Sequence, residues 1–304
     1  MVYRIRRTEL ASPASNVKMM RKALEELPVD EVFLDLEDAV TPDMKEKARG
    51  NIVDVLSSSE ITPNKAVAVR INSLRTELWL DDLITVVSGA GDRIDCIIIP
   101  KVEGPEDVIA VDNVLTALEA KNRLGKRIGI EVLIETAKAV EYIREIAYTS
   151  SRVESLIFGP GDYAASVGMP SLTIGELKQE YQGHVWHYVM ARIRNTAASA
   201  GLQAIDGPYA VIEDLKGLEE SARIARSMGY DGKWVIHPKQ LEVCNRVFTP
   251  TPEEVEKARR ILNEYEKARR EGRGAISIEG ELIDAATIRM AERILTLAGR
   301  VGVY

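Results

Sequence analysis

The sequence predicts an α/β protein built on a parallel barrel, because short apolar runs alternate with charged, helix-forming stretches along most of the chain. One strand is expected at residues 7–12, and the other apolar runs cover residues 31–38, 66–72, 96–102, 129–135, 155–162, 202–209 and 233–238. A length of 304 residues suits one such barrel with an appendage. We therefore expect a TIM (β/α)8 barrel with a C-terminal helical lid extension.

Two domains are expected, a barrel catalytic domain at residues 1–250 and a lid extension at residues 251–304. Thr251-Pro252-Glu253-Glu254 has the spacing of a capping box with proline in the first turn, so a helix should run from there to about Arg270, before Gly272 and Gly274. Residues 275–278 and 281–283 should form a small hairpin around Glu279-Gly280, followed by a helix at 285–297. This tail is either an outer packing element or a lid.

Composition excludes several classes of protein. Hydrophobic residues make up 45% of the chain and aromatic residues only 5%, so aliphatic side chains must fill the core. A net charge of −7 argues against a general nucleic-acid surface. Cys96 and Cys244 do not form a disulfide framework, and neither a signal-peptide core nor a long apolar span is present. A cytoplasmic protein is expected.

Carboxylates follow two of the apolar runs directly. Glu135 comes after residues 129–134, and Asp162 lies in the Gly-Pro-Gly-Asp-Tyr segment that begins at Gly159. Acidic side chains at the mouths of buried strands, with glycine beside them, suit a hard-cation site, so Glu135 and Asp162 are the predicted metal ligands. Other polar residues end the remaining runs: Asp35, Glu37, Asp38, Arg70, Asn72, Lys101, Glu103, Asp206 and His237. Their convergence predicts one site, although each residue alone also fits a solvated loop.

Three of these positions, Glu37, Asp38 and Lys101, have explicit alternatives. Glu37 and Asp38 are expected to hold metal-bound waters and to orient Arg70, whereas a capped strand end before Thr41-Pro42 is an equal alternative. Lys101 is either functional or a strand-end side chain with its ammonium in solvent. His184 and His187 have a helical spacing, but they lack the further ligands that a zinc site needs.

Nine segments in register resemble the citrate-lyase β-subunit-like (HpcH/HpaI aldolase) superfamily. They are RTELASPASNVKMMRKAL, FLDLEDAV, VRIN, AGDRIDCIIIPKVE, IET, GPGDYAASVGM, DGPYAVIEDLKGL, GYDGKWVIHPKQ and GELIDAATI. Within it, DGPYA and GKWVIHPKQ are most similar to malyl-CoA and β-methylmalyl-CoA lyases. The resemblance implies a TIM barrel, a Mg²⁺ ion (with Mn²⁺ as a possible substitute) and reversible cleavage of a coenzyme A thioester into an acyl-CoA and a 2-oxo acid.

The resemblance also implies roles for individual residues. Glu135 and Asp162 match its metal ligands, and Arg70 matches the arginine at the oxo acid and the developing enolate. Further matches are Lys22 at the coenzyme A phosphates, Gly161 at the substrate carboxylate, Ile236 and His237 at the acyl-CoA site, and Asp284. Asp284 corresponds to a lid aspartate that reaches a neighbouring subunit's site, so a homo-oligomer, trimer or hexamer, is expected. We expect Asp284 to be the base that exchanges a proton with the acyl-CoA methyl carbon.

Four functions remain open from the sequence. The first is a Mg²⁺-dependent lyase that converts L-malyl-CoA or β-methylmalyl-CoA to glyoxylate and acetyl-CoA or propionyl-CoA. A citramalyl-CoA lyase would release pyruvate instead, and one extra methyl group changes binding by only about 1–3 kcal/mol, so dual use is possible. A malyl-CoA thioesterase is a third alternative. The fourth is a citrate lyase β-type subunit that needs protein partners.

Overall fold

A computed structural model describes residues 3–170, 173–175, 184–270, 272, 275–278 and 280–302. The chain divides into two compact units, Met1–Asn245 and Arg246–Tyr304. The predicted division into residues 1–250 and 251–304 stays a prediction. None of the described helices combines the length and the apolar character needed to cross a membrane.

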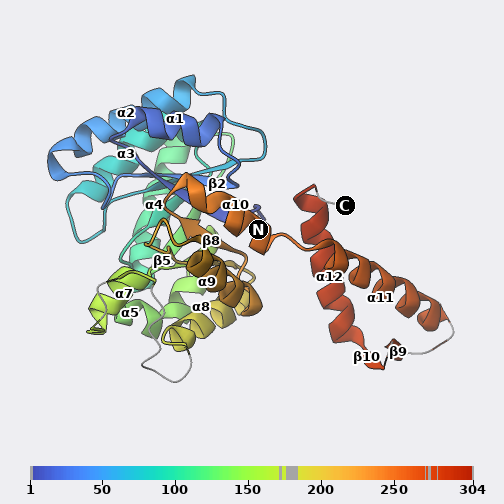
Figure 1. Cartoon of the computed structure of the whole chain (residues 1–304). Helices are drawn as coiled ribbons and strands as arrows, with labels where there is room; N and C mark the ends of the chain where they lie inside the picture. Colours follow the sequence, from blue (N-terminus) through green and yellow to red (C-terminus); the bar gives the residue numbers. More distant parts are fainter. Residues whose placement is uncertain are drawn as a thin grey trace. The chain divides into compact units, whose positions relative to one another are not determined.

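The first unit confirms the predicted barrel. Eight parallel strands close in sequence order, β1 next to β8, and Figure 1 shows helices around them. The strands are β1 Thr8–Pro13, β2 Glu31–Asp35, β3 Ala66–Arg70, β4 Cys96–Ile99, β5 Gly129–Ile134, β6 Val153–Phe158, β7 Gln203–Asp206 and β8 Gly232–Val235. Most of them end before the predicted runs do, so Glu37, Asp38, Lys101 and Asp162 lie in the loops and helix starts beyond the carboxyl ends.

Helices connect the strands and cover the outside of the barrel. They are α1 Val17–Glu25, α2 Lys45–Ser58, α3 Leu78–Ala90, α4 Pro105–Asn122, α5 Ala137–Glu141, α6 Ile143–Tyr148, α7 Pro160–Ser166, α8 His187–Ala200, α9 Leu215–Ser227 and α10 Leu241–Phe248. Short 3-10 turns lie at Pro42–Met44, Gly91–Arg93 and Pro238–Gln240. Each helix buries an aliphatic face, as α2 does with Ile52, Val55 and Leu56.

The inside of the barrel is layered because side chains alternate along each strand. An apolar layer takes a residue from every strand; it consists of Ala11, Phe33, Ala68, Cys96, Ile98, Leu133, Ile157, Ile205 and Trp234. Two residues further along the same faces come Asp35, Arg70 and Glu135, at the carboxyl ends. Two residues back come Glu31 and Glu131, nearer the amino ends. Polar layers therefore lie on both sides of an apolar one.

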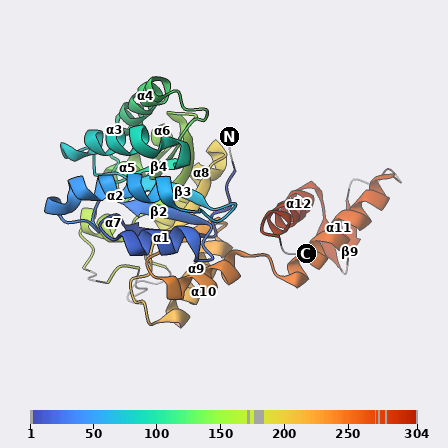
Figure 2. The ribbon, with the colours of Figure 1, turned by 90° about the horizontal axis from the view of Figure 1, so that it is seen from above.

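The second unit is a small helical element with a hairpin. Helices α11 Pro252–Arg270 and α12 Ala285–Arg300 lie side by side in Figures 1 and 2, and strands β9 Ile276–Ile278 and β10 Glu281–Ile283 pair antiparallel. The predicted helices and hairpin are confirmed. Thr251 caps α11 as expected, with its hydroxyl accepting from Glu254 N (3.2 Å) while Glu254 accepts from Thr251 N (2.8 Å). Gly274 and Glu279 lie outside the described residues.

Candidate active site

Two adjoining pockets open at the carboxyl ends of the strands. One, of about 410 Å³, has a largely apolar wall that includes Trp234 and Ile236; we term it the apolar-walled pocket. The other, of about 690 Å³, has a polar wall that includes Asn72 and Ser73; we term it the polar pocket. Asp38, Glu135 and Asp162 line both pockets. A substrate with one apolar and one charged part could therefore bridge the two pockets across these carboxylates.

Glu135 is held rigidly at the junction of the pockets. It follows β5, its side chain is buried, and its Oε1 atom accepts a hydrogen bond from the backbone N of Lys101 at 2.6 Å. A Cβ atom at Gly159 would lie 2.5 Å from both Cβ and Oε2 of Glu135, so glycine is required for these two loops to approach. Asp162, in the first turn of α7, lines the same junction.

The electrostatics of the junction favour a bound cation. Burial raises the pKa of Glu135 to about 8, and the negative charges of Glu37 and Asp162 contribute to the increase. Several carboxylates thus share a confined space at an energetic cost, which a divalent cation would offset. Oxygen donors from carboxylates are the ligands that Mg²⁺ prefers, and two protein carboxylates leave positions for water and substrate. The donor set at Glu135 and Asp162 therefore fits the cation that the sequence predicts.

Arg70 lies at the end of β3 and is fixed by two acids from the β2 end. Its Nε and Nη2 atoms donate to Asp35 Oδ1 and Oδ2, both at 2.7 Å, and its Nη1 forms an ion pair with Glu37 Oε2 at 2.9 Å. The guanidinium carbon also lies 5.1 Å from the centre of the Trp234 ring. Burial alone would lower the pKa of Arg70, but Asp35 and Glu37 raise it, so Arg70 is a permanent cation beside the apolar-walled pocket.

Lys101 connects the acids that follow β2 with Glu135, which follows β5. Its Nζ atom donates to Glu37 Oε1 at 2.6 Å and to Asp38 Oδ1 at 3.2 Å, while its backbone holds Glu135. Glu37 thus contacts Arg70, whereas Asp38 contacts Lys101, and the predicted roles of both acids at metal-bound waters stay predictions. Sequence reasoning left Lys101 undecided and did not identify Asp35 as the main partner of Arg70. The available signal was that Asp35 and Arg70 both lie at the ends of neighbouring strands, where they are register partners.

The remaining predicted residues occupy different places. Gly161 and Ile236 line the apolar-walled pocket. His237 caps the turn after β8, where its Nδ1 accepts from Lys239 N at 3.1 Å. Lys22 is on the exposed side of α1 and is not among the described residues that line the two pockets. Asp284 belongs to the second unit and caps α12, accepting from Ala286 N at 2.8 Å and Thr287 N at 3.1 Å.

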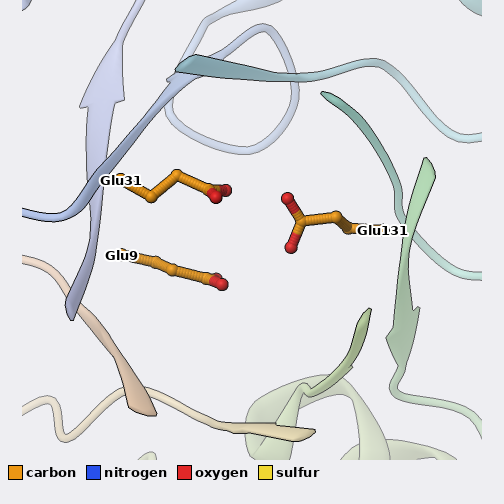
Figure 3. Close-up of side chains that lie close together, drawn as sticks. All are labelled: Glu9, Glu31 and Glu131. Atoms are coloured by element: carbon orange, nitrogen blue, oxygen red, sulfur yellow. The ribbon is translucent and has the colours of Figure 1, made fainter. Parts of the chain in front are cut away.

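A second acidic cluster lies near the amino ends of the strands and is separate from this site. Glu9, Glu31 and Glu131 point toward one another in Figure 3, and a carboxylate oxygen of each lies within 4.8 Å of the others. Arg6 is fully buried among them, with Nε 2.8 Å from Glu31 Oε2 and Nη2 3.1 Å from Glu131 Oε1. A Cβ atom at Gly232 would overlap the backbone carbonyl of Arg6, so glycine lets the two backbones approach at this point. The guanidinium of Arg6 already neutralises part of the negative charge of the cluster. The cluster is therefore a polar part of the barrel core.

The fold and the site define a TIM barrel with a carboxylate- and arginine-lined pocket at the carboxyl ends of its strands. The sequence profile of the HpcH/HpaI aldolase/citrate lyase family matches residues 7–238, and the chain belongs to that family.

Named relatives align over nearly the whole chain. An L-malyl-CoA/β-methylmalyl-CoA lyase of Rhodobacter capsulatus is 38% identical, over 97% of this chain and 95% of the relative. A malyl-CoA/β-methylmalyl-CoA/citramalyl-CoA lyase of Chloroflexus aurantiacus is 37% identical, over 89% of this chain and 81% of the relative. Among solved structures, Mycobacterium tuberculosis CitE in complex with magnesium, acetoacetate and coenzyme A is 29% identical to this chain. The match covers 96% of this chain and 97% of the CitE chain, with a TM-score of 0.75.

Proposed function

We propose that the protein is a Mg²⁺-dependent carbon–carbon lyase that reversibly cleaves L-malyl-CoA or β-methylmalyl-CoA to glyoxylate and acetyl-CoA or propionyl-CoA. The observation that carries the proposal is the position of Glu135, Asp162 and Arg70 around one apolar-walled pocket. The names of the Rhodobacter capsulatus and Chloroflexus aurantiacus relatives support the substrate class. The magnesium and coenzyme A of the CitE complex support the cofactor and the thioester.

The proposed reaction places two electrostatic demands on the site. Removal of the 3-hydroxyl proton lets the C2–C3 bond break, and the electron pair of that bond moves into the thioester to give an enolate. Mg²⁺ held by Glu135 and Asp162 would supply Lewis-acid polarisation of the 2-oxo acid oxygens. Arg70, fixed by Asp35, supplies positive charge beside the pocket without reorganising during the reaction. The enolate then takes up a proton at carbon and leaves as acetyl-CoA or propionyl-CoA.

Asp284 is our proposed proton donor and acceptor at that carbon. Backbone hydrogen bonds from Thr287 and Ala286 lower the pKa of Asp284, and in this state the group is a weak base. Catalysis by Asp284 therefore requires its carboxylate to exchange these hydrogen bonds for a drier environment at an active site. We further propose that the protein is a homo-oligomer, a trimer or hexamer, in which Asp284 acts on a neighbouring subunit.

Coenzyme A binding is proposed for the side of the site that Ile236 lines. Ile236 is part of the apolar-walled pocket, with His237 directly after it, and Lys22 lies on α1, the helix whose Met19 also lines that pocket. A cationic side chain on that helix would suit the phosphates of the cofactor.

The test combines substrates and chelation. Purified protein incubated with Mg²⁺, acetyl-CoA and glyoxylate should form malyl-CoA, and a chelator should abolish product formation. Propionyl-CoA and pyruvate in the same panel would distinguish β-methylmalyl-CoA and citramalyl-CoA chemistry, both of which appear in the name of the Chloroflexus aurantiacus relative. Release of free coenzyme A from malyl-CoA, without glyoxylate, would identify a thioesterase instead. Absence of all these products would contradict the proposal.

A further inference from the structure

Lys101 adopts a backbone conformation that non-glycine residues usually avoid. Its φ angle is +51°, in the left-handed region, and it directly follows Pro100 at the end of β4. A lysine adopts left-handed backbone only at an energetic cost, so other contacts must maintain it. In this conformation the backbone N donates to Glu135 Oε1 at 2.6 Å. The strained position thus fixes one of the proposed cation ligands.

The side chain of the same residue fixes a different acid. Its Nζ atom donates to Glu37 Oε1 at 2.6 Å, and Glu37 Oε2 lies 2.9 Å from Arg70 Nη1. Glu37 is therefore clamped between two cations. Glu37 and Arg70 are buried, with side chains 6% and 5% exposed, whereas the Lys101 side chain is 31% exposed. Removing one partner of a buried ion pair leaves the other charge uncompensated, which is unfavourable, so the loss of one cation should make Glu37 seek another.

Glu37 is also a potential competitor for the cation. It lines the polar pocket together with Glu135 and Asp162. A carboxylate in this position has the chemistry of a Mg²⁺ ligand, and each additional protein ligand takes a coordination position that water or substrate would occupy. An enzyme that binds its substrate through the cation needs these positions open.

We propose that Lys101 is a positioning residue that withholds Glu37 from the cation at Glu135 and Asp162, which keeps coordination positions available for the 2-oxo acid. The proposal rests on the proposed function for the identity of that acid. It predicts an unusual combination of effects, because removing the ammonium should improve the binding of the metal while impairing the binding of the substrate. A residue that only supports the fold would weaken both.

The first measurement uses Lys101→Met, which removes the ammonium and keeps the backbone amide and a similar chain length. Mn²⁺ binding, followed by electron paramagnetic resonance, should become about tenfold tighter, because a positive charge is lost and Glu37 is released toward the cation. Oxalate is a stable stand-in for the 2-oxo acid. Calorimetry should show that oxalate binds the Mn²⁺-loaded variant at least about tenfold more weakly, because Glu37 then occupies a coordination position on the cation that oxalate needs.

Three further variants make the test specific. Lys101→Arg keeps the positive charge and should restore most of the wild-type oxalate affinity. Lys101→Met combined with Glu37→Gln removes the competing carboxylate, so the gain in Mn²⁺ affinity should disappear. Lys126→Met is the matched control: Lys126 pairs with Asp95 at 3.4 Å before β5, with its side chain 35% exposed against 31% for Lys101. This control should leave Mn²⁺ and oxalate binding unchanged.

Two results would overturn the assignment. One is a Lys101→Met protein in which Mn²⁺ and oxalate affinities fall together, and the other is one in which neither changes. Since both measurements are made without acyl-CoA, they are independent of the lyase assay. A protein that shows the predicted opposite changes but makes no malyl-CoA would disprove the proposed function and leave the role of Lys101 intact.

Discussion

Arg70 and Asp35 form a bidentate ion pair across the ends of two neighbouring strands, with both hydrogen bonds 2.7 Å long. The strands β2 and β3 are paired so that these two residues are direct register partners. The pair is buried, and the planar carboxylate matches the planar guanidinium. The barrel thus holds the positively charged guanidinium of Arg70 in one orientation beside the pocket.

Arg70→Lys tests this fixed direction. Lysine keeps the charge but cannot make the bidentate contact, so kcat/KM for malyl-CoA cleavage should fall by about 10²- to 10³-fold, the loss typical of one oxyanion-stabilising donor. Mn²⁺ binding should remain within about threefold of wild type, since the metal ligands are unchanged. Steady-state kinetics and a metal titration measure the two effects. A lysine variant with near-normal kcat/KM would remove Arg70 from the mechanism.

Gly159→Ala tests the geometry of Glu135 without changing any charge. The added methyl group would lie 2.5 Å from Cβ and Oε2 of Glu135 and must displace that side chain. Mg²⁺ affinity, measured by calorimetry, should therefore fall by at least about tenfold, in line with the effect of disturbing the support of a metal ligand.

Gly125→Ala is the control for that change. A Cβ atom at Gly125 would meet nothing within 4 Å, so this variant should bind Mg²⁺ like the wild type. Equal Mg²⁺ affinities for the two alanine variants would mean that the position of Glu135 does not matter for the cation.

Glu9→Gln tests the acidic cluster at the amino ends of the strands. Burial, with the nearby charge of Glu131, raises the pKa of Glu9 well above its ordinary value of 4.5. The folded protein then binds more protons than the unfolded chain, so the contribution of Glu9 to the free energy of unfolding is present below pH 4.5 and decreases as the pH rises toward the folded-state pKa.

Glutamine resembles the protonated form and does not titrate. The free energy of unfolding of Glu9→Gln, from urea titrations at several pH values, should therefore fall less steeply with pH than that of wild type above pH 4.5. Parallel pH dependences for the two proteins would show that Glu9 is ionised in the folded state.

Asp284→Asn separates catalysis from helix capping. Asparagine is as good an N-cap as aspartate, so α12 should keep its stability, whereas the amide cannot act as a base. Turnover should be lost while Mn²⁺ and oxalate affinities stay unchanged. Substantial turnover by the asparagine variant would exclude Asp284 as the proton donor and acceptor.

The fold could be predicted because aliphatic strand runs and charged helices have different periods, and the barrel follows from their alternation. The arrangement of the polar side chains inside the barrel could not be predicted. Period-two alternation puts Glu31, Phe33 and Asp35 on one face of β2, but nothing local shows that this face points inward or that Arg6 enters the barrel beside Glu31. The left-handed conformation of Lys101 also escaped prediction, because lysine rarely adopts it and its contacts come from other strands.

A crystal structure of the protein soaked with Mg²⁺ and oxalate would show the cation site itself. We expect one cation bound by carboxylate oxygens of Glu135 and Asp162, with oxalate completing its coordination and Arg70 still paired to Asp35. A cation held elsewhere, for example among Glu9, Glu31 and Glu131, or Glu135 and Asp162 side chains turned away from each other, would contradict it.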